Sequence, residues 1–272
     1  MENKKSVLES LLEIINNVAS GDYSNDIMAL TTDDTPEPVR TIAEAMGMMM
    51  VKIEAREYQL ELLIEELRGL NEQIKENSLQ TVAAMVQALE ARDAYTRGHA
   101  DRVATLAAET AMEMGMDKKA VEVVRTAGVL HDIGKIGCSD KIFQPHDAKS
   151  SPDMVREIIS HPGMGATILK RLDFLGEVRE IIHAHHERVD GKGYPKGLSG
   201  DAIPRGALII AVADAFDAMT TDRPYQKAKT REHALQILRE FSGKSWHPDC
   251  VSAFERLQLR KAASASTGDQ SG

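Results

Sequence analysis

A stretch of about fifty residues without proline constrains the fold of this chain more than any other feature. Between Ile42 and Asp93 only Gly47 and Gly69 interrupt a run dominated by strong helix formers. Apolar residues recur there every seven positions, with a second apolar position beside them: Ile53, Leu60, Leu67 and Ile74, then Leu63 and Leu70. Such a repeat predicts a signalling helix over residues 42–78 that pairs with a second copy as a parallel coiled coil. The alternative is a long helix packed on its own domain.

The segment before this helix, residues 1–41, has a different character. Residues 5–19 predict a short helix, GDYSND breaks it, and TTDDTPEPVR (31–40) is a polar entry to the next helix. Two helices joined by a linker and running into a coiled coil resemble a HAMP signalling module. Such modules normally follow a transmembrane helix. We expect no membrane span and no signal peptide, because no uncharged apolar run reaches about 18 residues and the N-terminus lacks an apolar core.

Composition narrows the class of protein. Aromatic residues make up only 4% of the chain, which favours helices over a β-sandwich or barrel, although residues 207–216 could form a strand or a buried helix. A net charge of −9 argues against binding duplex nucleic acid, which requires a basic face. Two cysteines, Cys138 and Cys250, cannot form a disulfide framework and indicate a cytoplasmic protein. The small polar tail, residues 259–272, is predicted to be disordered.

Histidines and aspartates gather at the ends or insides of apolar segments. VLHDIGKIG ends an apolar helix in two polar groups, and IIAVADAF encloses a carboxylate. Each such group costs free energy unless something pairs it. A capping or core role is the simpler interpretation for any one of them alone, whereas one or two metal ions would account for all. The predicted metal ligands are His99, His131, Asp132, His161, His185, His186 and Asp214.

These residues carry a resemblance to a known family. The order of His99, His131–Asp132 and Asp214 is similar to the H…HD…D pattern of the HD superfamily of metal-dependent phosphohydrolases. The segment HHERVDGKGYP (185–195), with LHDIGKIG and DRPY, resembles the HD-GYP subgroup. The resemblance covers about residues 79–258. It implies an all-α, HD-type helical bundle that follows the N-terminal helical and coiled-coil segment. The implied activity is a cyclic-dinucleotide phosphodiesterase, with cyclic di-GMP as the main substrate.

The resemblance also implies a role for each residue. His99, His131 and Asp214 would hold one divalent ion, and His161, His185 and His186 a second, with Asp132 bridging; a hydroxide shared by two ions, iron or manganese, would attack phosphorus. Lys135 would stabilise a phosphate oxygen, or else cap its helix. Arg223 would bind a second phosphate or a guanine edge, or else form a surface salt bridge. His183 has no ligand position in the pattern, so it is expected to be solvated or to support a ligand from behind.

Several positions depart from the family pattern. Tyr95 stands where members with three metals carry a glutamate, so two metals are expected. Gln226 replaces a basic residue after DRPY, and residues 142–153 lack the usual sequence of the loop beside the pocket. No departure removes a ligand, so they affect substrate preference more than hydrolysis. Cyclic GMP-AMP is the alternative substrate, and a slow-turnover module that binds a cyclic dinucleotide is the alternative function.

Overall fold

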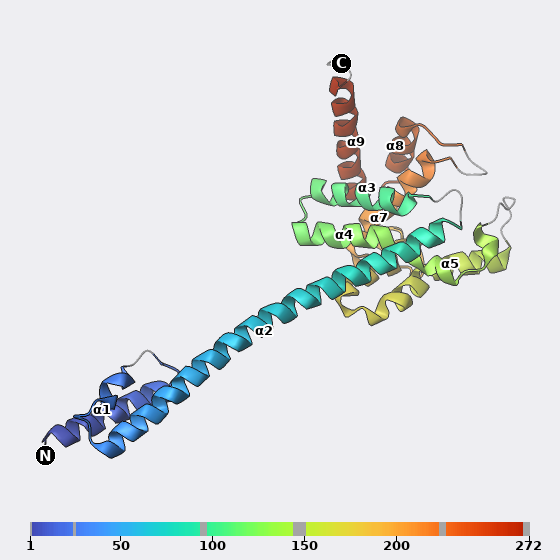
Figure 1. The fold of residues 1–272 in the computed structure, drawn as a ribbon. Coiled ribbons are helices and arrows are strands. Elements are labelled where there is room, and N and C mark those ends of the chain that lie inside the picture. Colours follow the sequence, from blue (N-terminus) through green and yellow to red (C-terminus); the bar gives the residue numbers. More distant parts are fainter. Residues whose placement is uncertain (1, 24–25, 93–96, 144–150, 223–226, 269–272) are drawn as a thin grey trace. The chain divides into compact units, whose positions relative to one another are not determined.

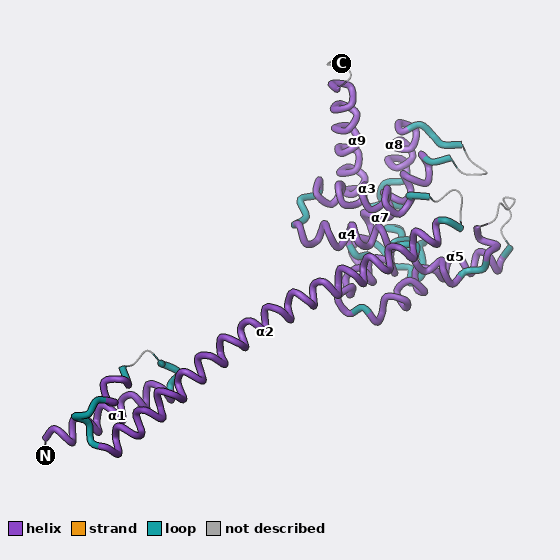
Figure 2. The backbone as a smooth tube through the Cα atoms, viewed as in Figure 1, coloured by secondary structure: helices purple, strands orange, loops and turns teal. Residues whose placement is uncertain are grey.

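The computed structural model describes residues 2–23, 26–92, 97–143, 151–222 and 227–268. In these residues the chain forms α-helices and short 3-10 turns but no strand, so the expected all-α fold class is confirmed (Figure 2). The chain divides into two compact units, residues 1–76 and 77–272. This division falls two residues before the boundary between 78 and 79 that the sequence predicts. None of the described helices is long and apolar enough to cross a membrane.

The N-terminal unit is built from α1 (Glu2–Ala19), the short turn η1 (Ile27–Thr31) and the first part of α2 (Glu37–Glu90). A small apolar core holds these elements together. Its buried members are Leu11, Ile27, Leu30, Ala43 and Met50. The two helices and linker expected from the sequence are therefore present, and their assignment to a HAMP module stays a prediction.

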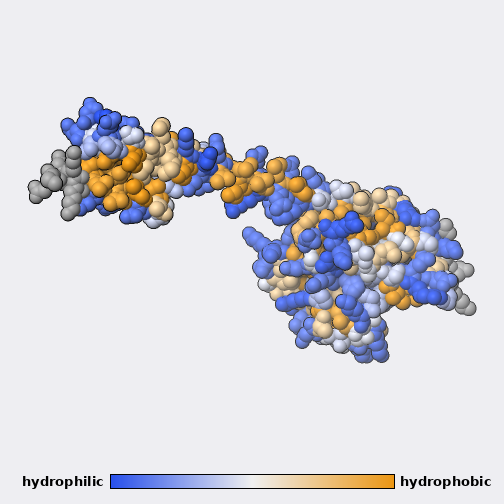
Figure 3. Space-filling view, turned by 90° about the horizontal axis from the view of Figure 1, so that it is seen from below, coloured by the Kyte–Doolittle hydropathy of each residue, from blue (hydrophilic) through white to orange (hydrophobic). Residues whose placement is uncertain are grey.

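Helix α2 is continuous over 54 residues, as its lack of proline predicts (Figure 1). Its heptad positions are exposed: Leu60 is 57% accessible, Leu67 56% and Ile74 63%. Figure 3 shows apolar side chains on the surface of this part of the helix. Nothing in the described part of the chain covers this apolar stripe, which we define as Leu60, Leu63, Leu67, Leu70 and Ile74.

The C-terminal unit contains residues 77–90 of α2 and seven further α-helices. Their bounds are α3 (His99–Glu113), α4 (Lys118–Leu130), α5 (Pro152–Ile168), α6 (Gly176–Ala184), α7 (Arg205–Thr220), α8 (Arg231–Glu240) and α9 (Pro248–Gly268). Helix α7 is apolar on nearly all sides and lies in the core, so the segment 207–216 is a buried helix and not a strand. Helices α3 and α4 approach closely at Gly128, where a Cβ atom would lie 2.6 Å from Cα of Ala104.

Helix α9 corrects one expectation from the sequence. It runs to Gly268, so most of the tail that was predicted to be disordered is helical. The small residues that suggested disorder include several alanines, and alanine is the strongest helix former. Ion pairs also hold this helix against α3: Arg256 Nε lies 2.9 Å from Glu113, and Lys261 Nζ lies 2.5 Å from Glu109.

Candidate metal centre

The expected ligands come from the ends and interiors of five helices of the C-terminal unit. His99 is the first residue of α3, and His131 follows the last residue of α4. His161 lies inside α5, His185 and His186 follow α6, and Asp214 lies inside α7. Their side chains are buried or partly buried. A histidine at a helix end can be buried without interrupting the apolar face along which the helix packs. This explains why several of the histidines directly precede or follow apolar helical segments.

The first ligand group contains His99, His131 and Asp214, whose potential ligand atoms all lie within 4.8 Å of one another. Nε2 of His99 is 3.4 Å from Oδ1 of Asp214. The rings of His99 and His131 meet edge to face, with their centroids 5.2 Å apart. Two imidazoles and one carboxylate in this arrangement could hold a divalent ion.

The second ligand group contains His161, His185 and His186, again with ligand atoms within 4.8 Å of one another. Asp132 lies between the two groups. Its Oδ2 atom is 3.6 Å from Nε2 of His131, and its Oδ1 atom is 3.4 Å from Nε2 of His161. One carboxylate therefore reaches both groups, which is the placement that a bridging ligand requires.

The hydrogen bonds of the Nδ1 atoms show whether the Nε2 atoms of these histidines are free to bind a metal. Nδ1 of His131 lies 2.7 Å from the carbonyl oxygen of Gly128. Nδ1 of His161 lies 2.5 Å from the carbonyl oxygen of Ile158, and Nδ1 of His185 lies 2.6 Å from that of Ile182. A carbonyl oxygen only accepts, so each Nδ1 carries the proton and each Nε2 presents a lone pair. This is the tautomer that binds a metal through Nε2. The residues present fit divalent metal ions.

The electrostatics of the second ligand group and Asp132 agree with this interpretation. Burial lowers the pKa of His161 to about 4 and also lowers the pKa of His185 and His186, so these rings are neutral. Burial acts in the opposite direction on Asp132, yet Lys135, His131 and His161 hold the pKa of its carboxyl well below the ordinary value. The neutral imidazoles of the second ligand group thus lie beside an ionised, buried carboxylate, an environment that attracts a cation.

Sequence reasoning missed two residues that support His99. Nδ1 of His99 donates to Oδ2 of Asp217 at 2.7 Å, and Arg102 donates to the same carboxylate through Nε at 2.6 Å and Nη2 at 3.0 Å. Burial disfavours a charged His99, but Asp214 and Asp217 raise its pKa to about 10. The available signal was spacing, because Asp217 follows Asp214 by three residues and therefore shares its face of the helix.

The turn after α6 folds back on the end of that helix. The buried carboxylate of Glu187 accepts hydrogen bonds from the backbone N–H groups of Lys196, at 2.7 Å, and Leu198, at 3.0 Å. At Gly193 a Cβ atom would lie 2.4 Å from the backbone nitrogen of Arg188, so this position requires glycine. The Tyr194 ring lies over His186, with their centroids 4.9 Å apart. The GYP element therefore packs against His186, one member of the second ligand group.

The remaining predicted residues have different positions. Lys135 lies in the turn η2 (Ile133–Gly137), with Nζ 2.5 Å from Oδ2 of Asp132. Its positive charge therefore lies beside the carboxylate that separates the two ligand groups. His183 lines a separate pocket and belongs to neither ligand group. The remaining three, Arg223, Tyr95 and Gln226, lie outside the described residues.

Comparison with known proteins identifies the family. Residues 83–249 match the model of the HD domain. The chain is 42% identical over 171 residues to a cyclic di-GMP phosphodiesterase of Thermotoga maritima, covering 62% of this chain and 46% of that protein. It is 33% identical over 175 residues to the 3'3'-cGAMP-specific phosphodiesterase 3 of Vibrio cholerae, covering 64% of this chain and 38% of that protein. The chain thus spans less than half the length of either relative.

Solved structures agree on the fold. A cyclic GMP-AMP specific phosphodiesterase of Vibrio cholerae superimposes with a TM-score of 0.51 at 22% identity, covering 65% of this chain and 48% of that chain. Together with the match over more than half of the sequence, this confirms the family that the histidine and aspartate motifs indicate. The chain belongs to the HD domain family.

Proposed function

We propose that this chain hydrolyses a phosphodiester bond of a cyclic dinucleotide, with cyclic di-GMP as the preferred substrate. The observation that carries the proposal is the pair of ligand groups with Asp132 between them. Seven side chains leave several coordination positions of two octahedral ions open, as catalysis requires and a structural site does not. The names of the relatives, which act on cyclic dinucleotides, support the choice of substrate.

The proposed assignment gives each ligand a place. His99, His131 and Asp214 would hold one ion, His161, His185 and His186 would hold the other, and Asp132 would reach both. Iron or manganese suits a set of nitrogen and oxygen ligands without thiolate. Bound there, two divalent ions would acidify a water molecule and neutralise charge on the phosphate.

The chain's own residues supply the remaining steps. Lys135, whose ammonium lies beside Asp132, would donate to a non-bridging phosphate oxygen and oppose the negative charge that grows in the transition state. Arg223 would hold the second phosphate or a guanine edge by its two parallel donors. The Tyr194 ring over His186 would exclude water from one side of the second ligand group.

A second substrate, cyclic GMP-AMP, is favoured by a specific observation. The relative from Vibrio cholerae that is 33% identical to this chain is named as specific for that compound. Both substrates present the same phosphodiester to the ligand groups and differ in one base. The choice between them therefore depends on residues outside the ligand groups.

The apolar stripe of α2 supports a proposal about assembly. We propose that two copies pair through this stripe as a parallel coiled coil, because exposed leucines at heptad spacing are stabilised when a second helix covers them. Both cysteines are buried and free, which supports our proposal of a reducing, cytoplasmic location.

One experiment tests the activity. The protein is purified without oxygen, loaded with iron or manganese, and incubated with cyclic di-GMP or cyclic GMP-AMP while chromatography follows the linear product. Turnover of cyclic di-GMP is expected, and the Asp132→Ala variant is the inactive control. Tight binding of either compound without product would refute hydrolysis and favour the slow-turnover module.

A further inference from the structure

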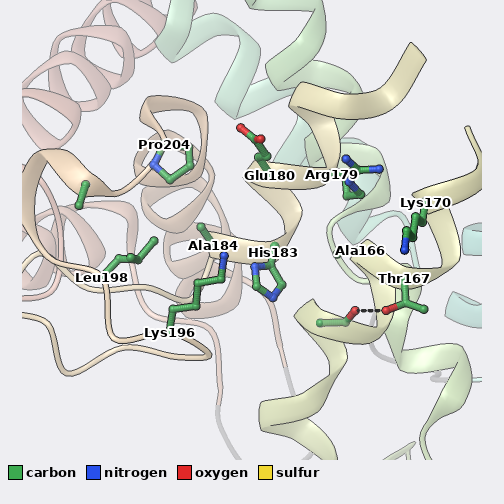
Figure 4. Close-up of a pocket in the computed structure, with 12 residues that line it drawn as sticks. Ala166, Thr167, Lys170, Arg179, Glu180, His183, Ala184, Lys196, Leu198 and Pro204 are labelled. Atoms are coloured by element: carbon green, nitrogen blue, oxygen red, sulfur yellow. Dashed lines mark hydrogen bonds between the residues drawn. The ribbon is translucent and has the colours of Figure 1, made fainter. Parts of the chain in front are cut away.

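A second pocket lies in the C-terminal unit, apart from the metal ligands. It is open to solvent, has a volume of about 590 Å³ and is lined by residues of α5, the short turn η4 (Leu169–Arg171), α6 and the segment after the GYP turn (Figure 4). Pockets for small molecules typically measure about 300–1,000 Å³. The pocket is therefore large enough for a ligand of nucleotide size.

Among the described residues, three cationic side chains and one carboxylate line this pocket. Lys170, Arg179 and Lys196 are the cations, and Glu180 is the carboxylate. Within the described residues none of the three cations forms an ion pair. Figure 4 shows Lys196 on one side of His183, with Lys170 and Arg179 on the other. In a chain with a net charge of −9, this local excess of positive charge selects an anion.

The rest of the lining suits a ligand that is only partly charged. Ala184, Leu198 and Pro204 form an apolar wall on one side of His183, and Ala166 lies on the other side (Figure 4). The His183 ring is half-buried, and its Nε2 atom lies 3.9 Å from where a Cβ atom would stand at Gly163. An imidazole edge, an apolar wall and several cations together match a molecule with a phosphate and a flat ring system.

We propose that this pocket, which we call the anion pocket, binds a phosphate-bearing small molecule of nucleotide type. Its walls are shared with the second ligand group. Helix α6 carries His183 into the anion pocket and is followed at once by His185 and His186, and α5 carries both Gly163 and His161. The two helices that line the pocket therefore also position three of the proposed metal ligands. The proposal does not depend on hydrolysis.

The test uses the full chain after chelators have removed metal, so that a failure of catalysis cannot be mistaken for a failure of binding. Inorganic phosphate and GMP are titrated while NMR follows the Cε1–Hε1 signal of His183, assigned with the His183→Gln variant. Both probes are expected to shift that signal to saturation, with GMP binding about tenfold more tightly because it also covers the apolar wall. Lys170→Gln and Lys196→Gln should each weaken binding about tenfold.

Matched controls remove the same charge outside the pocket. Lys192 lies in the same turn as Lys196, and Arg171 follows Lys170, but neither lines the anion pocket. Lys192→Gln and Arg171→Gln should leave both affinities unchanged. Equal weakening by all four variants would show only a general charge effect and would overturn the proposal. A His183 signal that neither probe moves, or GMP binding no tighter than phosphate, would likewise overturn the nucleotide site.

Discussion

His99 and Asp217 are joined by a hydrogen bond of 2.7 Å between Nδ1 and Oδ2, across 118 positions of sequence. The bond fixes the His99 ring so that Nε2 faces Asp214, at 3.4 Å. Arg102 donates to both oxygens of the same carboxylate. We therefore infer that Asp217 positions the His99 ring in the first ligand group.

We expect Asp217→Asn to weaken metal binding, because a neutral amide orients the ring less firmly and makes it a weaker ligand. Residues that support a ligand from behind typically change metal affinity about 10–100-fold. Titration of the metal-free chain with Mn²⁺ measures the effect. Asp201→Asn, an exposed position with the same charge change, is the control. Equal affinities in the two variants would remove the role proposed for Asp217.

Asp132 and Lys135 should separate metal binding from rate. Asp132→Ala removes the carboxylate between the two groups, so both metal and turnover should be lost. Lys135→Ala should retain metal but reduce the rate of hydrolysis about 100-fold, because it removes a positive charge that stabilises the negative charge on the phosphate in the transition state. Metal analysis of the purified variants, together with the product assay, checks both outcomes. Full activity in Asp132→Ala would contradict the bridging assignment.

Two glycines offer a matched test of packing behind the ligands. A Cβ atom at Gly134 would lie 1.9 Å from the carbonyl oxygen of His161, whereas at Gly176 nothing lies within 4 Å. Gly134→Ala should lower the free energy of unfolding by about 3 kcal/mol and displace His161, since backbone must move to relieve the clash. Gly176→Ala should be neutral or slightly stabilising. Urea unfolding of both variants decides, and equal stabilities would contradict the close packing of η2 on α5.

Glu187 should determine the stability of the GYP turn. Its side chain is 2% exposed and accepts two backbone hydrogen bonds. Glu187→Ala leaves two N–H groups without an acceptor, so the free energy of unfolding should fall by about 2–4 kcal/mol. Glu187→Gln retains one acceptor oxygen and should lose less. A larger loss in Glu187→Gln than in Glu187→Ala, measured by urea unfolding, would contradict this account.

The apolar stripe of α2 predicts the mass of the particle in solution. Light scattering of the full chain should give twice the monomer mass of 29.9 kDa. Leu63→Lys combined with Leu67→Lys should return the monomer mass, because each lysine would be buried in the seam. Tyr58→Lys with Leu62→Lys is the control, since both residues are as exposed but lie outside the heptad seam. A monomeric wild-type chain would contradict the proposed pairing.

The sequence was most informative where a residue conflicts with its surroundings. Asp214 in an apolar run and His131–Asp132 at an apolar helix end need partners, and the structure brings them together with His99 and His161. Asp217 lies at the end of the same apolar run and is marked only by its spacing of three residues from Asp214. Its role arises only when α3 packs against α7, and a single sequence does not specify that contact.

The prediction that the tail is disordered was wrong for a related reason. Small polar residues have little apolar surface to bury, so composition alone favours disorder. The ion pairs of α9 with Glu109 and Glu113 depend on the position of α3, which is far away in the sequence. The sequence also left open whether residues 207–216 form a helix or a strand, because a short apolar run is compatible with both. Packing in the core decides for the helix.

The hydrogen bonds from Nδ1 of His131, His161 and His185 to backbone carbonyl oxygens have one more consequence. In each case the acceptor is the backbone oxygen three positions earlier, at Gly128, Ile158 and Ile182. A main-chain oxygen is present whichever side chain its residue carries. The proton on these three rings is thus held by main-chain geometry, and a substitution at the partly buried Ile158 would leave unchanged which nitrogen faces the ligand groups.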